Sequence, residues 1–208
     1  MSLRVVFQGD SITDAGRSRE YDQHMGSGYP TLTAAKLAYE MPGKYECLNR
    51  GISGNRIVDL YARWRIDAIN LKPDILSILI GVNDVWHDVG GRLNGVEADR
   101  FEKVYDMLLD YTQEQLPQTK IIVLEPFILR SAMTEEYWDY FEKEVPLRAA
   151  AAKRAAERHN TAFIPLQEDL ERMSKIAPVE CWLRDGVHPN FGGHELIARK
   201  LVETIKAL

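Results

Sequence analysis

Residues 74–84 read DILSILIGVND, an apolar run that ends in a cluster of small and polar side chains. Isoleucine and leucine dominate the first seven positions, and a strand this apolar is typical of the centre of a parallel sheet, which is covered on both faces. In open parallel sheets, ligands bind beyond the carboxyl ends of the strands. The stretch therefore predicts a central strand and, directly after it, a position where functional side chains gather.

Shorter apolar runs on either side of this stretch predict four more strands, at 3–8, 45–49, 120–124 and 161–165. Segments with helical periodicity alternate with them, at 30–40, 57–71, 96–115, 134–143, 147–158 and 193–208. Pro146 is interpreted as the start of the helix over 147–158, because proline suits the first turn better than the interior of a helix. The alternation predicts an α/β fold, a three-layer α/β/α, flavodoxin-like, doubly wound parallel sheet of five strands.

The composition predicts one domain over residues 1–208, since 45% hydrophobic and 27% charged residues suffice for a packed core. A net charge of −5 argues against partners such as nucleic acid or anionic membranes. No apolar run approaches the ~18 residues of a membrane span, and the first residues, MSLRVVFQGD, do not read as a secretory leader. We therefore expect a cytoplasmic protein in which Cys47 and Cys181 are reduced core thiols.

Polar clusters follow the other predicted strands as well. The first strand continues into GDSITD at 9–14, the second into NRGISGN at 49–55, and DGVHP at 185–189 precedes the last helix. Each cluster alone has an ordinary structural explanation, such as a helix N-cap, an Asx-turn or a surface loop. Together with 81–84 they place a hydroxyl, a glycine amide, a carboxamide and an Asp–His pair at one edge of one sheet, which indicates a functional site.

The chemical requirements of acyl transfer match this set of side chains. A serine hydroxyl such as that of Ser11 is a poor nucleophile and needs a neighbouring base, for which His188 is the candidate. Asp185, three residues earlier, can hold the His188 ring and stabilise its protonated form. The oxyanion that forms needs preorganised donors, and the backbone amides of Ser11 and Gly54 with the side chain of Asn83 are candidates.

The four blocks Gly-Asp-Ser-Ile, Gly-Ile-Ser-Gly, Gly-Val-Asn-Asp and Asp-Gly-Val-His resemble those of the SGNH hydrolases, the GDSL esterase/lipase family, in the correct order and over nearly the whole chain. The resemblance implies the SGNH hydrolase fold and catalysis by Ser11, Asp185 and His188. It also implies an oxyanion hole formed by Ser11, Gly54 and Asn83, with no cofactor. The scattered histidines show no metal-binding spacing, and the nucleophile elbow of α/β-hydrolases is absent.

A narrower resemblance points to bacterial acetylxylan esterases and related carbohydrate deacetylases. It rests on GDSITDAGR at 9–17, NRGISGN at 49–55, ARW at 62–64 and GVNDVW at 81–86. It implies hydrolysis of short-chain esters, acetyl above all, of carbohydrates such as acetylated xylo-oligosaccharides, and it implies self-association as a homo-oligomer. Trp86 and Trp182 adjoin the catalytic blocks, so each is a candidate to bind a sugar face, or else an ordinary core or rim aromatic.

Several alternatives stay open at this point. An acyl thioesterase or lysophospholipase of the same family would use the same machinery on other esters. A metal-dependent phosphoesterase would need several converging carboxylates and histidines, and a binding domain without activity would be expected to lack one of the catalytic residues. Ser53 is a weaker candidate nucleophile than Ser11. Arg56, Arg63 and Arg184 lie near the motifs, and we assign them no role because arginines on helix faces are usually solvated.

Overall fold

The structure is a computed structural model that describes residues 2–208, and its five strands form one parallel sheet in the order β2-β1-β3-β4-β5. These strands are β1 (Leu3–Gly9), β2 (Tyr45–Asn49), β3 (Ile75–Leu79), β4 (Lys120–Leu124) and β5 (Ala162–Ile164). Every predicted strand is confirmed, with its ends displaced by one residue at most. The order is that of flavodoxin-like folds, in which β3 and its neighbours are buried on both faces.

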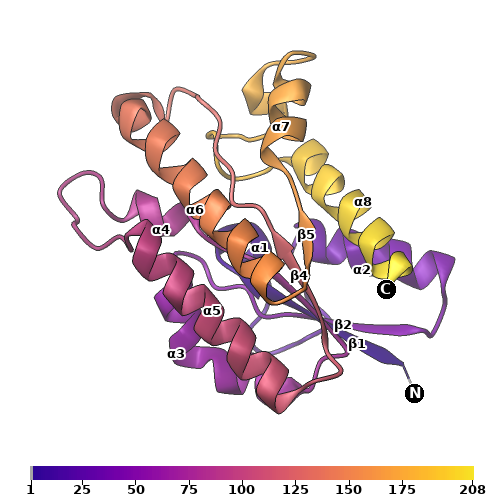
Figure 1. Cartoon of the computed structure of the whole chain (residues 1–208). Coiled ribbons are helices and arrows are strands. Elements are labelled where there is room, and N and C mark those ends of the chain that lie inside the picture. Colours follow the sequence, from indigo (N-terminus) through magenta and orange to yellow (C-terminus); the bar gives the residue numbers. More distant parts are fainter. Residues whose placement is uncertain (1) are drawn as a thin grey trace.

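Helices cover both faces of the sheet (Figure 1). On one side lie α2 (Tyr29–Glu40) and α8 (Phe191–Ala207), and on the other lie α3 (Ile57–Asp67), α5 (Ala98–Gln115) and most of α6 (Trp138–Arg158). The short helices α1 (Ser11–Asp14), α4 (Val82–Trp86) and α7 (Gln167–Ser174) fill the connections. The three-layer α/β/α architecture is therefore confirmed.

Side chains of β3 alternate between two apolar cores. Ile75 and Leu79 belong to the core beneath α2 and α8, whereas Leu76 and Ile78 belong to the core beneath α3 and α5. Successive residues of a strand point to opposite faces, so a strand that is apolar at every position requires helices on both sides. This requirement explains why the stretch that follows Asp74 decides the fold.

The predicted break at Pro146 is wrong, because α6 is a single helix that passes through this residue. Proline lacks an N–H group and crowds the preceding turn, which costs about 3 kcal/mol in a helix interior. Packing on both sides of Pro146 outweighs that cost. Val145 is buried just before it, and just after it the buried guanidinium of Arg148 donates two hydrogen bonds to the Val96 carbonyl.

Other departures from the sequence predictions are local. The helix expected to reach residue 71 ends at Asp67 and is followed by a short 3-10 turn, Ile69–Leu71. Cys181 is exposed, so the expectation of a core thiol is wrong for that residue, while Cys47 is half-buried and burial raises the pKa of its thiol to about 12. None of the helices in residues 2–208 has the length and apolar character that a membrane span requires.

Two short helices begin immediately beyond neighbouring strands. β1 ends at Gly9 and α1 begins at Ser11, while β3 ends at Leu79 and α4 begins at Val82. Because β1 and β3 are parallel neighbours in the sheet, both helices start at the same edge. The fold thereby brings Ser11 and Asn83, 72 positions apart in the sequence, to one place.

Candidate active site

Ser11 is held at the start of α1 by a buried turn. The Asp10 side chain caps the helix by accepting a hydrogen bond from the Ile12 N–H at 2.9 Å. Asp10 is fully buried, and burial raises its pKa to about 7. Gly9, just before it, packs so tightly that a Cβ atom would collide with the Thr13 side chain and the Leu79 carbonyl. This turn fixes the backbone from which the Ser11 hydroxyl projects.

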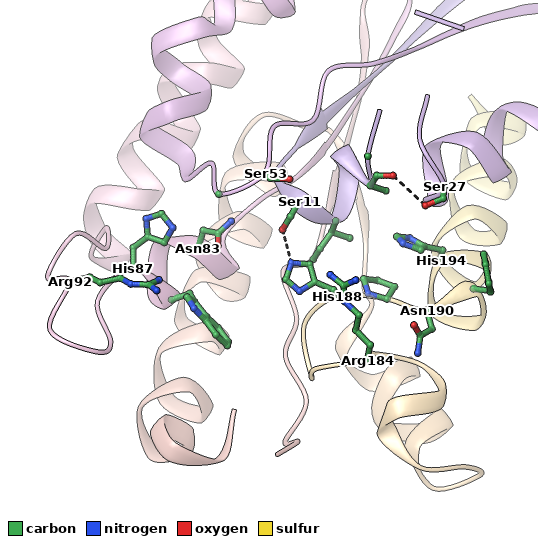
Figure 2. A pocket seen from close by; sticks show the side chains of 17 residues that line it. Ser11, Ser27, Ser53, Asn83, His87, Arg92, Arg184, His188, Asn190 and His194 are labelled. Atoms are coloured by element: carbon green, nitrogen blue, oxygen red, sulfur yellow. Dashed lines mark hydrogen bonds between the residues drawn. The ribbon is translucent and has the colours of Figure 1, made fainter. Parts of the chain in front are cut away.

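One chain of hydrogen bonds joins Ser11, His188 and Asp185. The Ser11 Oγ lies 2.8 Å from His188 Nε2, and His188 Nδ1 lies 2.7 Å from Asp185 Oδ2. The other Asp185 oxygen accepts the backbone N–H groups of Val187 and His188, at 3.1 and 2.7 Å. The structure therefore brings together the three residues that the sequence singled out, with the ring nitrogens arranged as expected. Figure 2 shows the contact between Ser11 and His188.

The environment of Asp185 keeps its carboxylate ionised. Partial burial acts to raise the pKa, but hydrogen bonds from the His188 ring and from two backbone N–H groups outweigh it and lower the pKa to about 2. A carboxylate that stays charged at neutral pH can orient the imidazole ring and stabilise the imidazolium that forms when His188 takes up a proton.

Three candidate oxyanion donors line the same pocket as the Ser11 hydroxyl: the backbone N–H groups of Ser11 and Gly54 and the side-chain amide of Asn83. The two backbone N–H groups make no hydrogen bond to any of residues 2–208. Asn83 Nδ2 is held by a 3.1 Å hydrogen bond to the Asn55 carbonyl. Gly54 has φ +82°, a left-handed conformation that favours glycine. These donors face a space that a substrate oxygen can enter.

The pocket in front of Ser11 has a volume of about 700 Å³ (Figure 2). Trp86 lines it, with its ring stacked on Phe141 at a centroid distance of 4.9 Å. Trp182 does not line it, which contradicts the expectation that this ring meets a substrate. The Trp182 indole N–H donates to the Ala177 carbonyl, and its ring packs against Gly192 at the start of α8, where the small glycine makes room for it.

The GDSL-like lipase/acylhydrolase family matches residues 7–196. The chain belongs to this family. It is 32% identical to an acetylxylan esterase of Geobacillus stearothermophilus, over 97% of this chain and 93% of that protein. The crystal structure of an acetylxylan esterase from the same organism superposes with a TM-score of 0.87, at 31% identity and with 98% and 94% of the two chains covered.

A second solved structure, that of a GDSL-like lipase from Parabacteroides merdae, superposes with a TM-score of 0.92. It is 37% identical to this chain, and the superposition covers 99% of this chain and 96% of that one. Family membership and these relatives establish that the chain is a carboxylic ester hydrolase. The resemblance to SGNH hydrolases and to their acetylxylan esterase branch is thereby confirmed.

Arg63 holds together the loops that carry Ser11 and Gly54, a role that the sequence analysis missed. Its guanidinium donates to the Arg50 carbonyl at 2.9 Å, to the Gly9 carbonyl at 3.3 Å and to Asn55 Oδ1 at 2.7 Å. It thus joins the loop after β1 to the loop that carries Gly54. The expectation of a solvated arginine is wrong here, because Arg63 points from α3 under these loops. Only the fold brings its acceptors together.

Ser53 is occupied by a structural contact. Its backbone N–H and its hydroxyl both donate to Asp14 Oδ2, at 2.9 and 3.0 Å. Arg19 contacts the same carboxylate oxygen at 2.7 Å. The Ser53 hydroxyl therefore anchors the loop that precedes Gly54, which fits its lower rank as a candidate nucleophile.

Asp84, next to Asn83, is a buried carboxyl group that connects two motifs. Both of its oxygens accept the Ile57 N–H, at 3.0 and 3.2 Å, and its backbone carbonyl accepts the Val96 N–H at 2.8 Å. Burial raises the pKa of Asp84 to about 8, so the group is mainly protonated at neutral pH. It links α4 to the first turn of α3 and thereby helps to fix Asn83 relative to Gly54.

Replacing Asp84 with asparagine is expected to remove part of the pH dependence of stability. Folding raises the Asp84 pKa from 3.8 to about 8, so the folded protein keeps a proton that the unfolded chain releases. Stability should therefore fall as pH rises from about 4 to about 8, by up to about 1.4 kcal/mol per pH unit. Asparagine retains an acceptor for the Ile57 N–H and cannot ionise, so calorimetric unfolding temperatures of D84N should fall less over this range.

The matched control for this prediction is Asp139→Asn. Asp139 is exposed at the start of α6 and makes no side-chain hydrogen bond or ion pair with any of residues 2–208, so its replacement should leave the slope of the wild-type profile unchanged. Parallel profiles for the wild type and D84N would show that Asp84 does not hold a proton in the folded state.

A metal centre would require several converging ligand side chains. Among residues 2–208, no group of three or more histidine, cysteine, aspartate or glutamate side chains is arranged to hold a metal ion.

Proposed function

We propose that this hydrolase is a serine esterase that removes short acyl groups, acetyl above all, from carbohydrates such as acetylated xylo-oligosaccharides. The observation that carries the proposal is the hydrogen-bonded chain from Ser11 through His188 to Asp185, open to a pocket with an aromatic wall at Trp86. The similarity to acetylxylan esterases supports the acyl group and the sugar.

In the proposed acylation step, His188 Nε2 takes the proton of Ser11 as its Oγ bonds to the ester carbonyl carbon. The electron pair of the carbonyl moves onto oxygen, and the oxyanion accepts hydrogen bonds from the N–H groups of Ser11 and Gly54 and from Asn83. The intermediate then collapses and the bond to the sugar oxygen breaks. The sugar leaves as an alcohol with the proton from His188, and the acyl group remains on Ser11.

Deacylation repeats these steps with water as the nucleophile. His188 takes a proton from a water molecule as its oxygen attacks the acyl carbon, and it returns this proton to Ser11 Oγ when the carboxylic acid is released. Asp185 holds the imidazole ring in both steps. Catalytic mutants of the Geobacillus esterase replace a serine, an aspartate and a histidine three positions after that aspartate, which is the spacing of Asp185 and His188.

The walls of the pocket support a short acyl group. Serine, asparagine, histidine and arginine side chains make up most of the lining around the Ser11 hydroxyl, and its aromatic side chains are Trp86, stacked on Phe141, and Phe191. A long alkyl chain gains about 0.8 kcal/mol per methylene only where apolar surface receives it. The polar side chains that make up most of this lining give little such gain.

The acyl preference can be measured with p-nitrophenyl esters from acetyl to octanoyl. We expect kcat/KM to fall at least about tenfold between acetyl and butanoyl, since added methylenes meet mainly polar side chains. Acetylated methyl xyloside and cellobiose acetate then test whether the alcohol part of the ester is a sugar. Acetate release is the readout, and heat-inactivated enzyme is the control. Faster cleavage of octanoyl esters than of acetyl esters would replace this proposal with the thioesterase or lysophospholipase alternative. If the sugar acetates release no acetate, the carbohydrate part of the proposal is rejected.

Three further expectations stay predictions: organisation of residues 1–208 as one domain, self-association as a homo-oligomer, and a cytoplasmic location without nucleic-acid partners.

A further inference from the structure

The pocket in front of Ser11 differs in charge from the chain as a whole. The chain has a net charge of −5. In contrast, the described residues that line the pocket include two arginines and three histidines, and no aspartate or glutamate. Asp185 does not line the pocket, and its carboxylate is hydrogen-bonded to the His188 ring. The surface that a substrate meets is therefore rich in cations and in hydrogen-bond donors.

Arg92 lies on the loop that follows α4 and extends toward the pocket (Figure 2). Its guanidinium makes no ion pair or side-chain hydrogen bond with any other residue of the described part of the chain, 2–208. The neighbouring ring of His87 stays mainly neutral, because burial, Arg56 and Arg92 lower its pKa. A guanidinium offers five N–H donors in a planar fork that matches an oxyanion. Arg92 is thus free to bind one.

Arg184 approaches the pocket from another side (Figure 2). Its side chain is 66% exposed, and its ion pair is a 3.6 Å contact with Asp185 Oδ2. The same oxygen already accepts a 2.7 Å hydrogen bond from His188, so it satisfies Arg184 only in part. Most donors of this guanidinium remain available on the pocket side of the Asp185–His188 loop.

His194 adds a neutral donor from the first turns of α8. Its Nδ1 accepts the Tyr29 N–H at 3.1 Å, which requires the ring proton to be on Nε2. The ring is only 7% exposed, and burial lowers its pKa to about 4, so it stays neutral at pH 7. Nε2 donates to no residue within 2–208, and the ring lines the pocket. Its N–H group is therefore available to a ligand oxygen.

We propose that the alcohol part of the natural ester carries an oxyanion, either the carboxylate of a uronic acid or a sugar phosphate, which binds Arg184 or Arg92, on opposite sides of the Ser11–His188 pair (Figure 2). His194 donates to a neighbouring oxygen of the same sugar. The sugar in this inference rests on the proposed function, whereas the negative charge on the substrate does not. Hydrogen bonds between arginine and a carboxylate or phosphate are short, charge-assisted and frequently bidentate, so they offset the loss of water around both partners.

Two matched substrate pairs test the charge and identify its source. The first compares methyl 2,3,4-tri-O-acetyl glucuronide with the corresponding uronamide, and the second compares methyl 2,3,4-tri-O-acetyl glucoside 6-phosphate with its 6-O-methyl analogue. We expect the anionic member of one pair to show at least about tenfold higher kcat/KM for acetate release. Salt should lower this ratio, because the Debye length shrinks from about 10 Å at 0.1 M to about 3 Å at 1 M.

Variants show which side chains produce the preference. Of R92Q and R184Q, the variant that removes the binding guanidinium should lower the ratio of anionic to neutral kcat/KM, and the double variant should bring it to about one. Because the ratio is taken within one variant, a general loss of activity cancels. R199Q is the matched control: Arg199 lies on α8 outside the pocket with a 72% exposed side chain, and its replacement should leave the ratio unchanged.

A ratio near one for both pairs in the wild type would overturn the inference, as would a preference that survives in the double variant. If all sugar acetates are inert, 4-acetoxybenzoate and 4-acetoxybenzamide provide the same comparison on an aryl ester. A ratio that falls in the R92Q/R184Q variant would then support the oxyanion site while the carbohydrate proposal fails. An unchanged ratio would reject the site as well.

Discussion

Replacing Ser11 with alanine is expected to lower kcat for p-nitrophenyl acetate by about 10⁴-fold or more while leaving the fold intact. The variant loses the atom that forms the acyl-enzyme, and losses of this size follow removal of a triad serine in other hydrolases. The side chain is small and half-buried, and the α1 cap is made by Asp10, so the circular dichroism spectrum and the unfolding temperature should change little. Steady-state kinetics with a burst-phase measurement provides the readout.

Ser53→Ala is the matched control for the nucleophile. Its hydroxyl donates to Asp14 at 3.0 Å, so this variant should lose loop stability and retain most of its turnover. A fluorophosphonate should attach to Ser11 in the wild type, as located by peptide mass spectrometry. Labelling of Ser53, or full activity in S11A, would contradict the assignment.

Loss of His188 is expected to cost nearly as much as loss of the whole proton-transfer unit. His188→Ala should lower kcat by about 10⁴-fold or more, and Asp185→Ala by somewhat less, because the serine and histidine steps are coupled through one imidazole. The double variant H188A/D185A should match H188A within a few-fold. Without the ring, Asp185 has no proton acceptor left to orient.

The measurement is a double-mutant cycle on kcat. Effects that multiply in the double variant would show that Asp185 and His188 act separately, against the 2.7 Å hydrogen bond between them. Asp169→Ala is a control for removing a carboxylate elsewhere: Asp169 pairs with Lys200 away from the pocket, and its loss should leave kcat close to that of the wild type.

The strands and most of the candidate site could be predicted because their signals are local. A buried parallel strand is a continuous apolar run, and in this fold the polar residues directly after such runs must meet at one edge. Ser11, Asn83 and Asp185 each stand in such a segment or beside the last helix. Sequence alone therefore indicated which residues meet, without any contact being known.

What could not be predicted depends on neighbours that are distant in sequence. Pro146 reads as a helix start, and only the tertiary contacts of Val145 and Arg148 on either side make it an interior residue. Trp182 adjoins a catalytic block in the sequence, yet its ring packs against Gly192 at the start of α8 and does not line the pocket. Arg63 finds its acceptors on two loops that only the folded sheet brings together. In each case tertiary contacts outweigh the local preference.

The 177 positions between Ser11 and His188 have a consequence during synthesis of the chain. The serine leaves the ribosome long before the histidine that the proposed mechanism uses as its base. Until α8 docks beside α2, where His194 accepts the Tyr29 N–H, the nascent serine is an ordinary alcohol. On the proposed mechanism, esterase activity begins only after the segment with His188 has been made and has folded against Ser11, so the onset of ester cleavage during refolding should report that step.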